Sequence, residues 1–140
     1  MPFERNPSEK PTWTDGPPPK ILVVDDAEDT RLLYASYLTY AGLKVQEAGD
    51  GAEALAIVVK SPPDLVVMDL AMPHLDGWES TRRIKSDPRT RDVRVIVVTS
   101  NAMADQLAKA RAAGADEVLT KPCLPEALFE SVCTVLRRRR

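Results

Sequence analysis

The sequence predicts an α/β protein with a doubly wound, parallel five-stranded sheet, on three observations. Aliphatic runs of strand length recur along the chain, and ILVV at 21–24 and LVVM at 65–68 are the clearest of them. These runs are continuous rather than alternating with polar residues, which is typical of parallel strands covered on both faces. Segments with helical spacing of apolar residues separate the runs, so strands and helices alternate.

Five strand–helix pairs are expected. Three aliphatic runs are strong and two are weak, and the first helix has Leu33, Tyr37 and Tyr40 at helical spacing. The predicted strands are 21–24, 43–48, 65–68, 93–98 and 116–120, and the predicted helices are 28–41, 50–60, 77–86, 102–113 and 125–138.

Local signals mark where several helices begin and end. Asp50 and Glu53 form a start that resembles a capping box. Gly42 and Gly114 stand where helices should stop. Pro125 suits the first position of the last helix.

Length and composition fit one domain, expected at 20–140, in a chain of 140 residues with net charge −2. That charge gives no argument for nucleic acid or membrane as a partner. Cys123 and Cys133 lack metal-site spacing, so we expect free thiols in a reducing compartment. No apolar run approaches the roughly 20 residues of a membrane span, and no secretory leader is visible. A cytoplasmic protein is expected.

The two ends of the chain differ in character. Residues 1–19 contain six prolines and are expected to form a disordered, Pro-rich tail, with a partner-binding arm as the alternative. Four arginines, Arg137 to Arg140, end the chain, and a solvated helix end is favoured over contact with acidic partners. No DNA-binding domain is expected after them.

Charged and polar residues stand at the carboxyl ends of four predicted strands. Asp25 and Asp26 follow the first, Asp69 the third, Thr99 the fourth and Lys121 the fifth. Functional sites of such sheets lie at these ends, so the five side chains should converge. Singly, each has an ordinary explanation as a helix cap, a turn or an exposed side chain. Jointly they predict a site where a hard cation such as Mg²⁺ offsets carboxylate repulsion and phosphoryl binds.

With these residues in place, the sequence resembles the receiver domain of two-component response regulators, in a single-domain, chemotaxis-regulator-like form. The matching pieces are ILVVDD, LVVMDLAMPHLDG, VIVVTS and AAGADEVLTKP, from residue 20 to about 136. The resemblance implies a flavodoxin-like (βα)5 sheet with strand order 2-1-3-4-5. It also implies a phosphorylation-controlled switch that catalyses only its own phosphotransfer and dephosphorylation and is not otherwise an enzyme.

The resemblance also implies the partners and the ligands of the site. Asp69 would accept phosphoryl from a histidine kinase or a histidine phosphotransfer protein. Asp26 would bind Mg²⁺ directly, Asp25 largely through water, and Asp69 and the backbone carbonyl of Ala71 would complete the protein ligands. Mn²⁺ could substitute for Mg²⁺.

Further residues would serve the switch. Thr99 would reach a phosphoryl oxygen and Lys121 would pair with the phosphoryl group, aimed by Pro122 after a cis bond. Asp76 and Gly77 would form the turn into the third helix. The surface of the fourth helix, fifth strand and fifth helix would change, acting on an unknown protein target or forming a weak dimer of an otherwise monomeric chain.

The sequence departs from the family at several positions. Val118 replaces the aromatic switch partner of Thr99, and its stiff, short side chain predicts a different or weaker output coupling. Ala71 and Asn101 each lie two positions past a site residue. Because alanine cannot orient an attacking water, the phosphorylated state should be long-lived, and a half-life of seconds would contradict this. His74 is interpreted as a solvated loop residue rather than a pH-sensitive group.

Other functions remain open from the residues alone. A phosphatase or phosphotransferase with an aspartyl-phosphate intermediate would want an acid where Ala71 stands. A non-phosphorylated receiver-like domain would normally lack part of the acidic pocket, which is complete here. A nucleotide-binding domain would need a glycine-rich loop after the first strand. The chain could also be a receiver module excised from a larger hybrid kinase or regulator.

Overall fold

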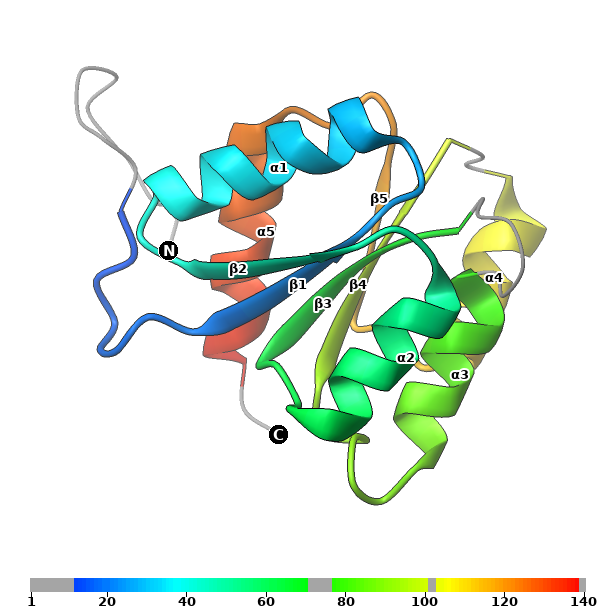
Figure 1. Cartoon of the computed structure of the whole chain (residues 1–140). Coiled ribbons are helices and arrows are strands. Elements are labelled where there is room, and N and C mark those ends of the chain that lie inside the picture. Colours follow the sequence, from blue (N-terminus) through cyan, green and yellow to red (C-terminus); the bar gives the residue numbers. More distant parts are fainter. Residues whose placement is uncertain (1–11, 71–76, 101–102, 139–140) are drawn as a thin grey trace.

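The computed structural model describes residues 12–70, 77–100 and 103–138, and it contains a parallel sheet between two layers of helices (Figure 1). The strand order is β2-β1-β3-β4-β5, which confirms the predicted doubly wound topology. Helices α1 and α5 cover one face of the sheet, and α2, α3 and α4 cover the other. The elements are β1 (Lys20–Val24), α1 (Glu28–Tyr40), β2 (Lys44–Ala48), α2 (Gly51–Lys60), β3 (Leu65–Asp69), α3 (Gly77–Ser86), β4 (Arg94–Thr99), α4 (Ala104–Ala112), β5 (Glu117–Thr120) and α5 (Pro125–Arg137).

All ten predicted elements are present, and their bounds differ from the prediction by at most two residues. The strands are where the aliphatic runs are because those runs are buried on both faces of the sheet. The longest helices have 13 residues, and no helix in the described ranges is long and apolar enough to cross a membrane.

The helix ends follow the predicted local chemistry. The Asp50 carboxylate accepts a hydrogen bond from the Glu53 N–H at 2.8 Å, as an N-cap should. The Glu53 carboxylate reaches back to the N–H of Gly49 at 3.1 Å, one residue before the cap. Gly42 and Gly114 have φ values of 96° and 98°, a conformation that favours glycine after a helix.

The buried face of α1 is not the one that Leu33, Tyr37 and Tyr40 mark by their helical spacing. Leu33 and Tyr40 are 56% and 53% exposed, although they share helical spacing with the partly buried Tyr37. Two neighbouring stripes of this helix carry apolar residues at i, i+4 spacing, so periodicity did not choose between them. The stripe that packs against the sheet and α5 also includes the small residue Ala35, which allows the helix to approach them closely. The buried residues of α1 are Tyr34, Ala35 and Leu38.

Two apolar cores lie on the two faces of the sheet. Ile21 and Val23 of β1 point towards the α1 and α5 side, and Leu22 and Val24 point towards the other. This alternation explains why a central strand reads as an unbroken aliphatic run. Cys133 of α5 lies in the core on the α1 and α5 side, where burial raises the pKa of its thiol to about 11 and keeps it protonated. Both cysteines are free thiols, as predicted.

Part of the predicted Pro-rich tail packs against the domain. The backbone N–H of Trp13 donates a hydrogen bond to the Ala41 carbonyl at 2.8 Å, just after α1. The Trp13 ring packs against the core on the α1 and α5 side, and the Arg137 guanidinium of α5 lies 5.7 Å from the ring centroid. Asp15 forms an ion pair with Arg137. Residues 12–19 therefore connect the ends of α1 and α5.

Trp13→Ala is expected to lower the free energy of unfolding by about 1–3 kcal/mol, because it removes a partly buried ring and its cation–π contact. Urea denaturation of the full chain measures this change. Thr14→Ala, at an exposed neighbouring position, is the matched control and should change stability by less than about 0.5 kcal/mol. A Trp13→Ala chain as stable as the Thr14→Ala control would show that the Trp13 side chain contributes little to the stability of the fold.

Candidate functional site

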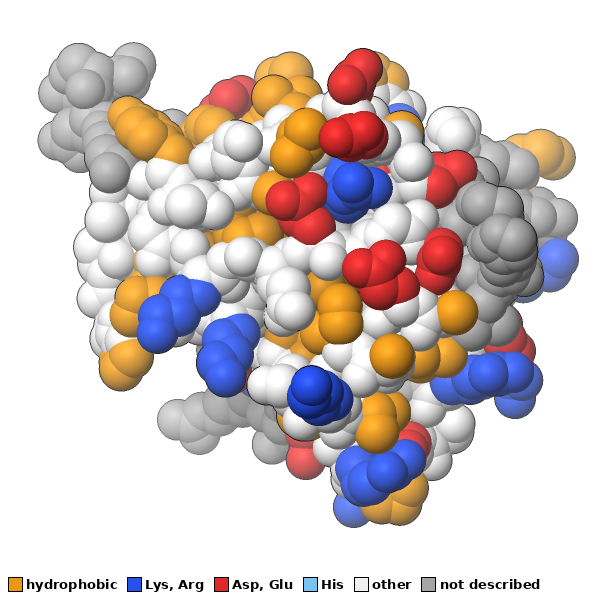
Figure 2. All heavy atoms as spheres, in the orientation of Figure 1, with side chains coloured by type: hydrophobic (Ala, Val, Ile, Leu, Met, Phe, Trp, Pro, Cys, Tyr) orange, Lys and Arg blue, Asp and Glu red, His pale blue; other side chains and the backbone are white. Residues whose placement is uncertain are grey.

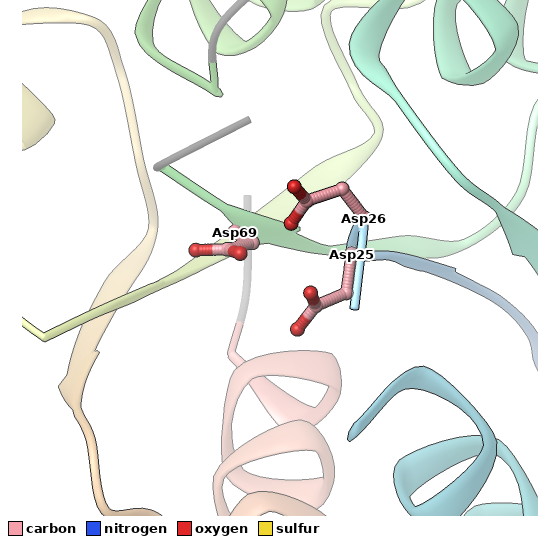
Figure 3. Close-up of side chains that lie close together, drawn as sticks. All are labelled: Asp25, Asp26 and Asp69. Carbon is pink, nitrogen blue, oxygen red and sulfur yellow. The ribbon is translucent and has the colours of Figure 1, made fainter. Parts of the chain in front are cut away.

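Three carboxylates meet at the carboxyl end of the sheet (Figure 3). Asp25 and Asp26 directly follow β1, and Asp69 is the last residue of β3. The two strands are hydrogen-bonded neighbours in parallel register, so their ends lie side by side. One ligand oxygen from each residue lies within 4.8 Å of the others. The convergence predicted from the strand ends is therefore present.

The three acids differ in their access to solvent. Asp25 and Asp69 are 3% and 5% exposed, whereas Asp26 is exposed. Burial of a carboxylate is costly unless a positive charge accompanies it. The Lys121 ammonium supplies that charge, with Nζ 3.6 Å from an Asp25 oxygen and 3.5 Å from an Asp69 oxygen. These distances are those of ion pairs rather than of short hydrogen bonds.

The backbone around Lys121 ties it to the neighbouring strand end. The Lys121 N–H donates to the carbonyl of Thr99 at 2.7 Å, just beyond the β4–β5 ladder. Thr99, the last residue of β4, is only 6% exposed. The Lys121–Pro122 peptide bond is cis, as the resemblance implied. Thr99, Lys121 and the acids thus share one rim.

Arg31 of α1 contacts the main chain of the acidic pair, and it was not among the residues predicted from the sequence. Its guanidinium donates to the main-chain carbonyl of Asp25 at 2.9 Å and pairs with Glu47 of β2 at 3.1 Å. The Asp25 carboxylate in turn accepts from the Ala27 N–H at 2.9 Å. Because Arg31 contacts a carbonyl group, which every residue has, no sequence pattern singles it out.

Gly77 lets the start of α3 approach the end of β3. A Cβ at this position would overlap the Asp69 carbonyl oxygen and lie 2.8 Å from the Leu70 Cα. The Gly77 N–H also lies 3.3 Å from the Leu70 carbonyl oxygen, to which it donates. The resemblance implied a turn at Asp76 and Gly77, and the structure adds a steric requirement for glycine at position 77, beside Asp69.

The donor set suits a hard cation. Carboxylate oxygens are the preferred ligands of divalent ions such as Mg²⁺, and one exposed acid leaves room for the waters that this ion retains. Acidic side chains also gather near the carboxyl ends of the strands on the face in Figure 2, while basic ones lie mainly on its lower part. The cluster Asp25, Asp26 and Asp69 could therefore hold a metal ion.

Some predicted residues lie elsewhere or outside the described ranges. Val118 of β5 is partly buried and packs against the core on the α2, α3 and α4 side of the sheet. The predictions for Ala71, His74, Asp76 and Asn101 concern residues that the structure does not describe.

The response regulator receiver domain family matches residues 21–133 of this chain. The chain belongs to this family. The DNA-binding dual master transcriptional regulator RpaA of Synechocystis is 36% identical over 120 residues, which are 86% of this chain and 50% of RpaA. The phosphate regulon regulator PhoB of Pseudomonas aeruginosa is 36% identical over 118 residues, which are 84% of this chain and 52% of PhoB. The receiver chain thus spans about half the length of these curated relatives.

Solved structures of receiver proteins share the fold. The chemotaxis response regulator CheY4 of Vibrio cholerae superposes with a TM-score of 0.80 at 30% identity, covering 84% of this chain and 98% of CheY4. A CheY-like receiver protein of Methanospirillum hungatei also has a TM-score of 0.80, at 26% identity over 85% of this chain and 94% of its own. The receiver domain is accordingly a signalling domain of two-component systems.

Proposed function

We propose that this receiver domain is a phosphorylation-controlled switch in which Asp69 accepts a phosphoryl group. The donor would be the phosphohistidine of a histidine kinase or histidine phosphotransfer protein. One observation carries the proposal: Asp69 is buried, lies 3.5 Å from the Lys121 ammonium, and belongs to a cluster with two further carboxylates. An acceptor for phosphoryl needs this combination of a nucleophilic oxygen and positive charge.

In the proposed reaction an Asp69 carboxylate oxygen attacks phosphorus, and the P–N bond to the donor imidazole breaks with its electron pair leaving on nitrogen. Asp25, Asp26 and Asp69, with the Ala71 carbonyl, would hold Mg²⁺ or Mn²⁺, which when bound offsets charge on the phosphoryl oxygens. Lys121 stabilises the same charge from the other side. The Thr99 hydroxyl is proposed to donate to a phosphoryl oxygen.

The proposed output follows from the added charge. Phosphorylation converts one of the three clustered carboxylates, that of Asp69, into an acyl phosphate with nearly two negative charges, which is a net gain of about one negative charge at the rim. Movement of Thr99 towards the new oxygens would shift the population of conformations at the α4, β5 and α5 surface. Val118 is smaller than an aromatic residue, so we expect weak coupling there. This surface would act on a downstream protein or form a weak dimer, and the free thiols suit a cytoplasmic setting.

Removal of divalent metal is expected to prevent phosphorylation of the full chain. Incubation with acetyl phosphate and Mg²⁺ should add one phosphoryl group by intact mass, whereas the same incubation with excess EDTA should add none. The physical reason is that the single charge of the Lys121 ammonium does not offset three carboxylates, so a dianionic donor is repelled unless a divalent cation is also bound. Restoring Mg²⁺ in excess over EDTA is the control. Equal phosphorylation with and without metal would contradict the proposal.

A second candidate is that this receiver is a module of a longer hybrid kinase or regulator. The observation in its favour is that RpaA and PhoB are about twice as long as the part that this chain matches. The phosphorylation chemistry would be the same, and the output would pass to another part of that protein. A receiver-like domain that is not phosphorylated is disfavoured because all members of the acidic site are present.

A further inference from the structure

Tyr34 of α1 reaches across the fold to the loop that carries Lys121. The side chain is buried, with 5% of its surface exposed, and its hydroxyl donates to the Cys123 carbonyl at 2.9 Å. The two residues are 89 positions apart in the chain. Burial of a tyrosine hydroxyl is favourable only if it finds such a partner, so this contact is a specific one.

The hydrogen bond completes a two-point attachment of the lysine loop. On one side, the Lys121 N–H donates to the Thr99 carbonyl at 2.7 Å. On the other, only Pro122 separates Lys121 from Cys123, whose carbonyl Tyr34 holds. The distances from the Lys121 ammonium to the two buried carboxylates therefore depend on both attachments.

The same helix also holds the acidic side of the site. Arg31, one turn before Tyr34, donates to the main-chain carbonyl of Asp25. Helix α1 therefore contacts both the segment that carries the acidic pair and the segment that carries the lysine. A rigid element that touches both partners of an ion pair can determine their separation.

The hydroxyl remains a donor under ordinary conditions. Burial, followed by the negative charges of Cys123, Asp25 and Asp69, raises the pKa of Tyr34 above its usual value. The group therefore stays protonated at neutral pH. Nothing about this contact requires a bound ligand or metal.

We propose that Tyr34 is a positioning residue that, through its hydrogen bond to Cys123, holds Lys121 at the distance from Asp25 and Asp69 that phosphoryl transfer needs. The inference rests on the proposed function for its kinetic consequence, but the attachment itself is independent of phosphorylation. Removal of the hydroxyl should release the loop, move Lys121 and leave the ring packing intact.

The test compares Tyr34→Phe with Tyr37→Phe, the same substitution one turn further along α1. Tyr37 contacts the rings of Tyr40 and Phe129. Hydrogen–deuterium exchange of the loop peptide at 120–124 should become faster in Tyr34→Phe and not in Tyr37→Phe. The rate of phosphorylation by acetyl phosphate at saturating Mg²⁺ should fall about three- to tenfold in Tyr34→Phe, the range of one lost hydrogen bond.

A double-mutant cycle with Lys121→Ala separates positioning from general structural damage. If Tyr34 acts through Lys121, adding Tyr34→Phe to Lys121→Ala should change the rate no further. An equal loss in both backgrounds, or unchanged exchange in Tyr34→Phe, would overturn the inference. If the unmodified chain accepts no phosphoryl group, the proposed function fails, and the exchange comparison alone then decides whether Tyr34 anchors the loop.

Discussion

Asp69→Asn is expected to abolish phosphoryl uptake completely. The amide keeps the size of the side chain but removes the anionic oxygen that would form the bond to phosphorus. It also removes one of three mutually repelling carboxylate charges, and Lys121 keeps its ion pair with Asp25 at 3.6 Å, so the variant should still fold. Intact mass after incubation with acetyl phosphate and Mg²⁺ is the measurement: one added phosphoryl group for the unmodified chain and none for the variant.

Asp92→Asn provides the matched control for this substitution. Asp92 is exposed and lies before β4, away from the carboxyl ends of the strands, so the same chemical change there should leave phosphorylation unaffected. Uptake of a phosphoryl group by Asp69→Asn at the rate of the control would show that another residue is the acceptor. The proposed function would then be wrong in its central assignment.

Gly77→Ala is expected to damage both stability and phosphorylation. The new Cβ would overlap the Asp69 carbonyl oxygen and lie 2.8 Å from the Leu70 Cα and 3.0 Å from the Asp69 carbonyl carbon. All three neighbours are backbone atoms, so no flexible side chain can move aside. We expect a loss of about 2–4 kcal/mol in the free energy of unfolding. Because Asp69 must shift, phosphorylation should slow by at least about tenfold.

Chemical denaturation and the rate of acetyl phosphate uptake measure the two effects separately. Gly49→Ala is the control, since a Cβ there would meet its nearest atom, an Arg31 nitrogen, at an ordinary 3.5 Å. The control should keep stability within about 0.5 kcal/mol of the unmodified chain. A Gly77→Ala chain that is as stable and as reactive as this control would show that α3 can move away from Asp69 at little cost.

Much of the fold was predictable because its signals are local. Continuous aliphatic runs, the Asp50 cap and the glycines after α1 and α4 are properties of a few neighbouring residues, and each was found where the sequence indicated. The face of α1 was not predictable in this way. Its two apolar stripes have the same period, and only packing against α5 and the sheet buried Tyr34 rather than Leu33.

The candidate site likewise has a part that was predictable from the sequence and a part that was not. Asp25, Asp26, Asp69, Thr99 and Lys121 could be placed on one rim because the carboxyl ends of parallel strands share an edge. Their surroundings came from tertiary contacts with backbone atoms, which have no sequence signature. These contacts are those of Arg31 with the Asp25 carbonyl, Tyr34 with the Cys123 carbonyl and Gly77 with the Asp69 carbonyl.

The order of strands and helices, the rim on which the acids and the lysine stand, and the family that the chain resembles were all predictable from the sequence. They were predictable because strand and helix formation depend on residues close together in the chain. The buried side of α1, the packing of Trp13 against the domain, and the residues that hold the Lys121 loop and the acidic pair became known from the folded structure alone. Those outcomes depend on distances between remote segments, and such distances exist only once the chain has folded.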